Sequence, residues 1–311
     1  MPSPGERKVI LVTRRSRLED LLVRFNTREQ ARFYVEHLGS DFGDYVAEHE
    51  TYQEAKRVVV QALETHGRFQ VIDRAFLPNF LFGQHDVVLA LGQDGVVANT
   101  MKYLDGQPLA GINPDPKRWD GVLLPWEPRA VASVLPSLLG NRLHVRDVTM
   151  GEARFADGQT LYAVNDFFVG PKSHTSARYE VKLNELKEVQ SSSGIIVSTG
   201  LGSTGWMRSI ITGSCAVASE AAHRPVSWKF RGRAWDERAL QFAVREPFPS
   251  RSTQATLVSG SVNEREALIV TSLMAENGVI FSDGIEADFL AFNAGTTVAI
   301  RVAQRVGKLV Q

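Results

Sequence analysis

The sequence predicts a protein of two parts, a doubly wound α/β domain followed by a β-rich, antiparallel domain. In about the first 140 residues, short apolar runs alternate with stretches of helical spacing, as in a parallel sheet covered by helices. Beyond Arg142 the apolar runs become short and alternating, with turn residues between them, which is typical of antiparallel strands. The chain has 311 residues, more than one compact core usually needs. We therefore expect one domain over residues 1–142 and a second over residues 143–302.

The first part is expected to contain four strands and at least three helices. Residues 27–38 begin with a capping pattern formed by Thr27 and Gln30, and their apolar residues have helical spacing. Residues 51–66 again begin with threonine, and Gly67 would end that helix. A third helix is expected over residues 127–139. The expected strands are residues 9–13, 69–72, 86–91 and 108–112.

The second part reads as a series of short strands. Turn pairs separate several of them, namely Asp157-Gly158, Asn277-Gly278 and Asp283-Gly284. Strands are expected at residues 161–169, 179–183, 194–198, 239–244, 255–258, 268–271, 279–281 and 297–302.

The composition excludes several classes of protein. The 35 basic and 35 acidic side chains cancel, so we expect no nucleic-acid partner. No apolar run approaches ~20 residues, so no membrane span is expected. Cys215 is the only cysteine, which excludes a disulfide within the chain and fits a reducing, cytoplasmic setting. The first residues lack the apolar stretch of a secretory signal.

The sequence LGQDG at residues 91–95 directly follows the most apolar expected strand. Open α/β sheets bind ligands at the carboxyl ends of their strands. Gly92 and Gly95 would let backbone amides approach a phosphate, with the next helix, expected over residues 96–103, adding its N-terminus. Asp94 could accept a proton from an attacking hydroxyl group. The alternative is an ordinary Asp-Gly turn with Asp94 as a helix cap.

Two further polar segments interrupt apolar sequence. Asn113 lies in GINPDP, after the fourth expected strand, where an ordinary turn is the alternative. Asn165 and Asp166 lie inside an apolar strand, where unpaired polar side chains are costly if buried. They offer the donors and acceptors that suit a base edge and a ribose diol. A β-bulge or a solvated edge is the alternative there.

The sequence GLGSTG at residues 200–205 matches the G-x-G-x-x-G fingerprint of dinucleotide-binding folds. That fingerprint should open the first βαβ unit and precede an acidic residue at the end of the next strand. Here it lies in the middle of the chain, and Glu220, at about the right spacing, lies in an alanine-rich helical stretch. A dehydrogenase is therefore a weak interpretation. The hydroxyl groups around the loop fit either a nucleotide site or a plain helix cap.

The order of these segments resembles the NAD kinase family. Gly92-Gln93-Asp94-Gly95-Val96 is similar to that family's Gly-Gly-Asp-Gly-Thr motif, Asn165-Asp166 to its Asn-Glu motif, and residues 202–206 to its Gly-Ser-Thr-Ala-Tyr loop. GINPDPKRWDGVLLP and SSSGIIVSTGLGSTGW look closest to the mitochondrial-type branch. The resemblance covers roughly residues 8–306.

The resemblance implies a Rossmann-like α/β domain and a β-sandwich-like domain, with residues of about 303–311 returning to the first. It implies that Asp94 is the general base, or at least the group that orients the attacking hydroxyl, and that Gly92 and Gly95 shape a phosphate cradle. The remaining residues implied to bind the nucleotide are Asn113, Asn165, Asp166, Thr204, Gly205 and Trp206. The implied reaction is ATP-dependent phosphorylation of the adenosine ribose 2′-hydroxyl of NAD, with Mg²⁺ on the phosphates. A homo-oligomer, often a dimer, is also implied.

Three residues depart from the family pattern. Gln93 replaces a glycine, Val96 replaces a threonine, and Asp166 replaces a glutamate that is longer by one methylene group. Two alternatives therefore stay open. One is a kinase of the same superfamily that acts on a lipid or sugar hydroxyl. The other is a catalytically degenerate NAD(H)-binding protein.

Overall fold

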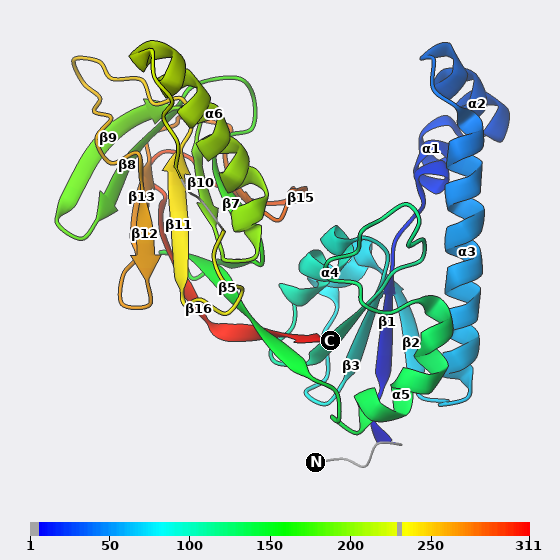
Figure 1. The fold of residues 1–311 in the computed structure, drawn as a ribbon. Coiled ribbons are helices and arrows are strands. Elements are labelled where there is room, and N and C mark those ends of the chain that lie inside the picture. The colour runs from blue at the N-terminus through cyan, green and yellow to red at the C-terminus, as the bar shows by residue number, and fades with distance from the viewer. Residues whose placement is uncertain (1–5, 229–231) are drawn as a thin grey trace. The chain divides into compact units, whose positions relative to one another are not determined.

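The computed structural model describes residues 6–228 and 232–311. These divide into two compact units, residues 6–146 with 308–311, and residues 147–307 (Figure 1). The first unit is built on a parallel sheet and the second on antiparallel sheets, which confirms the fold class predicted from the sequence.

The parallel sheet of the first unit has the strand order β2-β1-β3-β4-β16. The strands β1 and β3 are buried along their whole length, which explains why apolar runs marked them in the sequence. The last residues of β16 extend this sheet, because Lys308 and Leu309 pair in parallel with Pro108 and Leu109. The strands are β1 (Val9–Thr13), β2 (Phe69–Asp73), β3 (Val87–Leu91), β4 (Pro108–Ile112) and β16 (Thr297–Val310).

Helices pack against both faces of this sheet. Side chains of α3 and α5 form one core with alternate residues of β1 and β3, while α4 packs against β3 and β4. A short 3₁₀ turn (Pro128–Ala130) precedes α5. The helices are α1 (Arg17–Phe25), α2 (Arg28–His37), α3 (Phe42–Glu64), α4 (Asp94–Met101) and α5 (Val131–Leu139).

Two helices differ from the expectation. The helix expected at residues 51–66 begins at Phe42, because Asp41 caps it by accepting a hydrogen bond from the Gly43 amide at 2.7 Å. Thr51 lies inside that helix, on its exposed side. Helix α1 was not expected, although Ser16 and Glu19 form a capping box at its N-terminus, a pattern that indicates a helix start.

The second unit consists of two antiparallel sheets that enclose a common apolar core. One is six-stranded, with the order β12-β11-β10-β7-β14-β15. In the other, β16, β13, β8 and β9 are neighbours, and β5 pairs with β16 and β6. The strands are β5 (Val145–Phe155), β6 (Thr160–Ala163), β7 (Asp166–Pro171), β8 (Ala177–Leu183), β9 (Leu186–Ser192), β10 (Ile195–Ser198), β11 (Ala239–Val244), β12 (Ser259–Asn263), β13 (Leu268–Ser272), β14 (Gly278–Ser282) and β15 (Ile285–Ala291).

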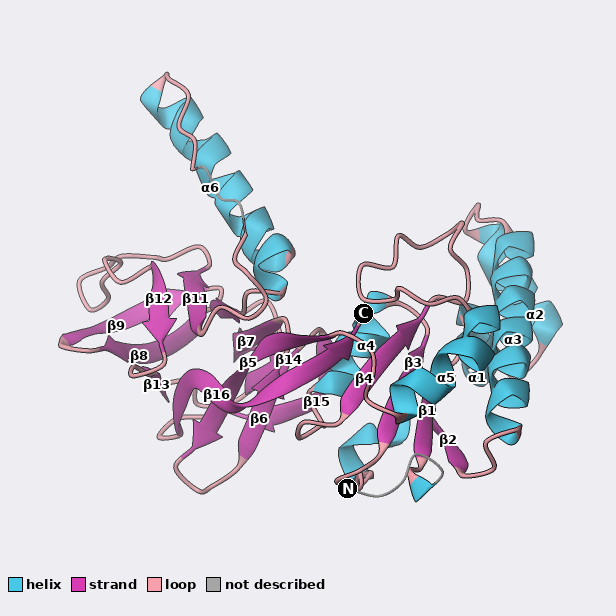
Figure 2. Cartoon of the chain, turned by 60° about the horizontal axis from the view of Figure 1, so that its bottom comes forward, coloured by secondary structure: helices cyan, strands magenta, loops and turns pink. Residues whose placement is uncertain are grey.

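Helix α6 (Trp206–Ala222) lies on the outer face of the six-stranded sheet. Its first turns pack on Phe168 and Ile196 through Met207 and Ile211, which are its two buried residues. Figure 2 shows the rest of α6 extending away from the strands.

Two of the strands predicted in this unit differ from the structure. The strand expected at residues 161–169 is two strands, because the chain leaves the sheet at Val164 and Asn165 between β6 and β7. The strand expected at residues 255–258 is a loop. The carboxylate of Glu188 accepts hydrogen bonds from the backbone amides of Thr256 and Leu257, so these amides do not pair with a neighbouring strand. Strand β12 therefore begins only at Ser259.

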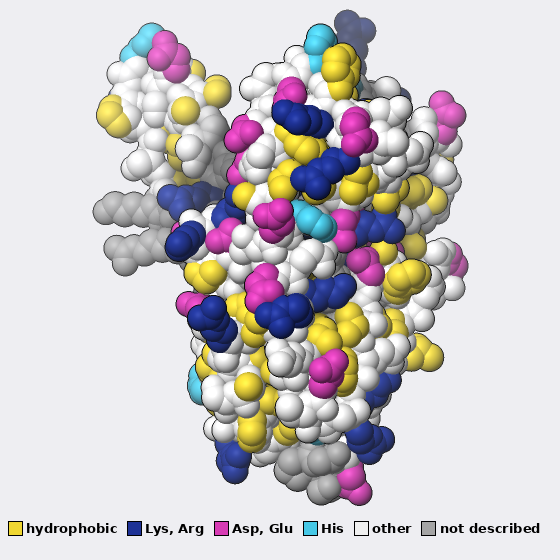
Figure 3. All heavy atoms as spheres, turned by 90° about the vertical axis from the view of Figure 1, so that its right-hand side faces the viewer, with side chains coloured by type: hydrophobic (Ala, Val, Ile, Leu, Met, Phe, Trp, Pro, Cys, Tyr) yellow, Lys and Arg dark blue, Asp and Glu magenta, His cyan; other side chains and the backbone are white. Residues whose placement is uncertain are grey.

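Charged side chains of both signs are intermixed on the face drawn in Figure 3. Within residues 6–228 and 232–311, no helix combines the length and the apolar composition that crossing a membrane requires.

Candidate functional site

The first group of predicted residues follows β3 in the first unit. Gly92 packs closely, since a Cβ there would lie 2.8 Å from Cγ2 of Val96. Gln93 occupies the N-cap position of α4 without a side-chain capping hydrogen bond, and its backbone is extended, at φ −103° and ψ 168°. A side chain is therefore accommodated at this position without backbone strain. Gly95 is exposed in the first turn of α4, with open space where a Cβ would be. The backbone amides of such a first turn are suited to an anion.

Asp94 begins α4, two residues earlier than the expected start of that helix. Its half-buried carboxylate accepts two backbone hydrogen bonds from the loop that follows β4. The Leu123 amide donates to Oδ1 at 2.8 Å and the Val122 amide to Oδ2 at 3.3 Å. Both oxygens are thus oriented by amide groups of another segment.

Asn113 is buried at the end of β4, and its side chain organises the loop that follows. Its amide group donates to the carbonyl of Trp119 at 3.0 Å, and its Oδ1 accepts from the Asp115 amide at 3.1 Å. The structure thus brings Gly92, Asp94, Gly95 and Asn113 to one edge of the parallel sheet, at the carboxyl ends of β3 and β4.

Arg14 at the same edge was missed by the sequence interpretation. It follows β1, and its buried guanidinium pairs with the buried carboxylate of Glu48 at 2.6 Å. The Arg14 amide donates to the hydroxyl of Tyr52, which donates to the carbonyl of Leu91 at 3.3 Å. Burial raises the pKa of Tyr52 to about 12, so the hydroxyl keeps its proton. The signal was available, because a run of arginines directly follows the first expected strand.

The second group of predicted residues lies in the second unit, at the break between β6 and β7. The Asp283 carboxylate accepts hydrogen bonds from the backbone amides of Val164, Asn165 and Asp166, with nitrogen–oxygen distances between 2.6 and 3.3 Å. These bonds satisfy backbone groups that leave the sheet ladder. The polar pair therefore marks a real interruption of the strand, which is the bulge-like alternative considered from the sequence.

Asp166 has an unusual electrostatic environment. Its Oδ1 is buried and has no hydrogen-bond partner among residues 6–228 and 232–311. Burial, reinforced by the neighbouring Asp283 carboxylate and opposed by a hydrogen bond with Ser198, raises the pKa of Asp166 to about 7. Near neutral pH, Asp166 can therefore act either as a hydrogen-bond donor or as an acceptor.

The glycines of GLGSTG allow close backbone packing. A Cβ at Gly200 would overlap the carbonyl oxygen of Ala234, and one at Gly202 would overlap that of Asn165. The preceding strand β10 pairs antiparallel with β7 and β11. The segment is therefore not the opening of a parallel βαβ unit, which the dinucleotide-binding fingerprint of dehydrogenases requires.

A cavity of about 780 Å³ lies in the second unit beside the start of α6. Trp206 stacks on Phe168, with ring centroids 5.9 Å apart and an interplanar angle of 2°, and the Arg245 guanidinium lies 5.4 Å from the Trp206 ring centroid. Lys172 and His174 also line the cavity.

Only one of the second group of predicted residues lines this cavity, namely Trp206. Thr204, the last residue of a short 3₁₀ helix (Gly202–Thr204), and Gly205 are exposed directly before Trp206. Asp166 and Phe168 are two residues apart on β7, so their side chains lie on the same face of the sheet.

Among the residues that the structure describes, no three His, Cys, Asp or Glu side chains are grouped so as to hold a metal ion. Magnesium that is bound through substrate phosphates needs only one or two carboxylates and no protein cage.

No protein-family model matches the sequence, and no curated protein matches it significantly. Solved structures do match the fold. A yeast NADH kinase complexed with NADH matches over 98% of this chain and 83% of its own, with a TM-score of 0.58 and 12% identity. An NAD kinase from Archaeoglobus fulgidus in complex with ATP matches over 97% and 93%, with a TM-score of 0.54 and 13% identity. The α/β unit, the β-rich unit and these likenesses together show that the chain has the fold of NAD kinases.

Proposed function

We propose that the protein is an NAD kinase-like phosphotransferase that uses ATP to phosphorylate the adenosine ribose 2′-hydroxyl of NAD, giving NADP and ADP. The observation that carries the proposal is the Asp94 carboxylate, which two backbone amides hold beside a glycine loop at the carboxyl edge of the parallel sheet. The likeness to kinases whose structures contain NADH or ATP supports it.

In the proposed reaction, the ribose 2′-oxygen attacks the γ-phosphorus of ATP. A bond forms between these two atoms, and the bond from the γ-phosphorus to the β–γ bridging oxygen breaks, which releases ADP. Asp94 accepts the hydroxyl proton, while the backbone at Gly92 and Gly95 and the N-terminus of α4 bind donor phosphates. Magnesium on those phosphates would neutralise their developing charge.

The residues of the second unit would bind the dinucleotide. Asn165 and Asp166 would hydrogen-bond the nucleotide, and an aromatic ring of the substrate would stack beside Trp206 in the cavity. Thr204 and Gly205 would contact the substrate from the loop, and Asn113 would shape the first site. The mitochondrial-type branch, a homodimer and a cytoplasmic location remain predictions.

The test is an NADP-forming assay with purified protein, NAD, ATP and Mg²⁺, read by an NADP-specific dehydrogenase. Asp94→Asn keeps the shape of the side chain but removes the base, so the rate should fall by about 10²–10⁴-fold. Asp20→Asn, an exposed acid on α1, is the matched control and should leave the rate unchanged. Nearly full activity in Asp94→Asn would exclude Asp94 as the base.

A degenerate NAD(H)-binding protein is the second candidate. Val96 favours it, because its methyl group fills the space next to Gly92 where the family has a hydroxyl group. Calorimetry that shows NAD binding, without turnover of NAD or of a panel of lipid and sugar acceptors, would support this candidate. Activity gained in Val96→Thr or Gln93→Gly would then locate the defect in the phosphate loop.

A further inference from the structure

The orientation of the Asp94 carboxylate depends on a loop of residues 113–126, which we call the Asp94 loop. The amides that hold the two carboxylate oxygens belong to Val122 and Leu123. A shift of this loop relative to α4 would therefore rotate the carboxylate or leave one of its oxygens without a donor.

The Asp94 loop is folded by its own contacts. The Asn113 side chain bridges Asp115 and Trp119, and the Leu124 amide donates to the carbonyl of Gly121 at 2.9 Å. Gly121 has a φ of +64°, which favours glycine. These bonds set the shape of the loop but do not attach it to the helices that cover the sheet.

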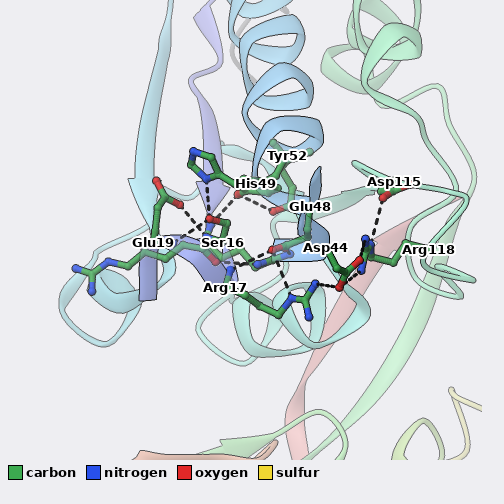
Figure 4. A network of polar contacts seen from close by, with 12 residues as sticks. Ser16, Arg17, Glu19, Asp44, Glu48, His49, Tyr52, Asp115 and Arg118 are labelled. Carbon is green, nitrogen blue, oxygen red and sulfur yellow. Dashed lines mark hydrogen bonds and ion pairs between the residues drawn. The ribbon is translucent and has the colours of Figure 1, made fainter. Parts of the chain in front are cut away.

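Arg118 provides that attachment, as Figure 4 shows. Its guanidinium donates to both oxygens of Asp44 in the first turn of α3, at 2.5 and 3.1 Å, and its Nε lies 3.5 Å from the Asp115 carboxylate. Arg17 of α1 donates to the same Asp44 carboxylate at 2.7 Å. The hydrogen bonds from Arg118 and Arg17 hold the pKa of Asp44 well below its usual range.

The main effect of this cluster is to fix the position of the Asp94 loop relative to α3. The Asp44 side chain is 42% exposed and that of Arg118 27%, so solvent screens the attraction and its effect on overall stability is small. A bidentate contact nevertheless fixes both the distance and the direction between two segments. Asp44 and Arg118 are 74 residues apart in sequence, and the loop between Arg118 and Leu123 is short.

We propose that Asp44 is a positioning residue for Asp94, acting through Arg118 and the Asp94 loop. The inference rests on the proposed function for the catalytic role of Asp94. The attachment of the loop by Asp44 does not depend on that function, and it can be tested separately.

The kinetic test uses Asp44→Asn in the full chain. Its kcat should fall by about tenfold, with the KM values for ATP and NAD changed less than twofold, because misplacement of a catalytic group acts on the chemical step. Arg118→Gln should give a similar loss, and the double variant should lose no more than either single one. Asp44→Glu, which keeps the charge, should recover part of the rate. Glu54→Gln, at an exposed acid on α3 that pairs with Arg57, is the matched control.

The structural test is hydrogen exchange of the same proteins, measured by mass spectrometry over residues 117–124. The amides of Val122 and Leu123 should exchange faster in Asp44→Asn and Arg118→Gln, and at the wild-type rate in Glu54→Gln. Unchanged exchange in Asp44→Asn would overturn the inference, as would faster exchange with an unchanged kcat. If the wild-type protein forms no NADP, the proposed function fails, and the exchange rates alone decide whether Asp44 holds the Asp94 loop.

Discussion

Replacing Asp166 by asparagine should make the protein more stable at neutral and alkaline pH. Asparagine has nearly the same shape and stays neutral, whereas the buried carboxyl group must lose its proton as the pH rises. Burial, reinforced by Asp283, raises the pKa of this group from 3.8 to about 7 in the folded protein. A group that holds its proton more tightly in the folded state stabilises the fold less and less as the pH rises between these two values.

The size of the effect follows from the two pKa values. At pH 5 the unfolded chain has ionised at Asp166 and the folded protein has not, and at pH 8 both have. The folded protein keeps the proton from pH 5 up to its pKa of about 7, an interval of about two pH units. At about 1.4 kcal/mol per unit, the free energy of unfolding should therefore fall by about 3 kcal/mol between pH 5 and pH 8. The asparagine variant lacks this loss, so its advantage over the wild type should grow by about 3 kcal/mol from pH 5 to pH 8.

Equilibrium urea unfolding at pH 5 and pH 8 measures this difference. Asp157→Asn is the control, because Asp157 is exposed and its pKa is lowered by hydrogen bonds from Gln159. Asp157 is ionised at both pH values in both states, so its variant should show no pH-dependent difference. A constant difference between Asp166→Asn and the wild type across this range would refute the reasoning and would mean that Asp166 is ionised throughout.

Three other outcomes are expected. Gly202→Ala should destabilise the protein by about 1–3 kcal/mol through overpacking, whereas Gly213→Ala, with open space in helix α6, should be neutral or slightly stabilising in thermal unfolding. Trp206→Ala should raise the KM for NAD by about tenfold, because it removes a stacking surface, whereas Phe248→Ala, at an exposed residue, should leave the KM unchanged. Equal KM values in the two variants would mean that the aromatic ring of the substrate does not stack beside Trp206. Leu309→Ala should cost about 2–5 kcal/mol, measured by urea unfolding, because Leu309 is fully buried in the first unit; a loss below that range would mean that this strand end contributes little.

The sequence could predict the elements that leave an apolar pattern. β1 and β3 are buried on both faces, so continuous apolar runs revealed them. β9 and β15, two strands at sheet edges, were missed. Most of their side chains are wholly or partly exposed, and strand pairing stabilises them without an apolar pattern. Helix α1 was missed because Leu18 is its one buried residue, so only its capping box could have revealed it.

The candidate site was predictable only in part. Short motifs located the glycine loop with Asp94, and also the polar pair Asn165-Asp166, because glycines and polar residues interrupt apolar strands there. The contact between Asp44 and Arg118 could not be predicted, since nothing local in either segment indicates a partner 74 residues away. The stacking of Trp206 on Phe168 likewise depends on how α6 packs on the sheet.

The pairing of Lys308 and Leu309 with β4 has a consequence for the order of folding during synthesis. Residues 6–146 leave the ribosome first, but the parallel sheet of their unit lacks a strand until residues 147–307 have also been made. Through that interval the exposed side of β4 presents unpaired backbone groups to other chains. The β-rich unit can complete most of its own pairing before the α/β unit does, which reverses the usual sequence in which the N-terminal domain is finished first.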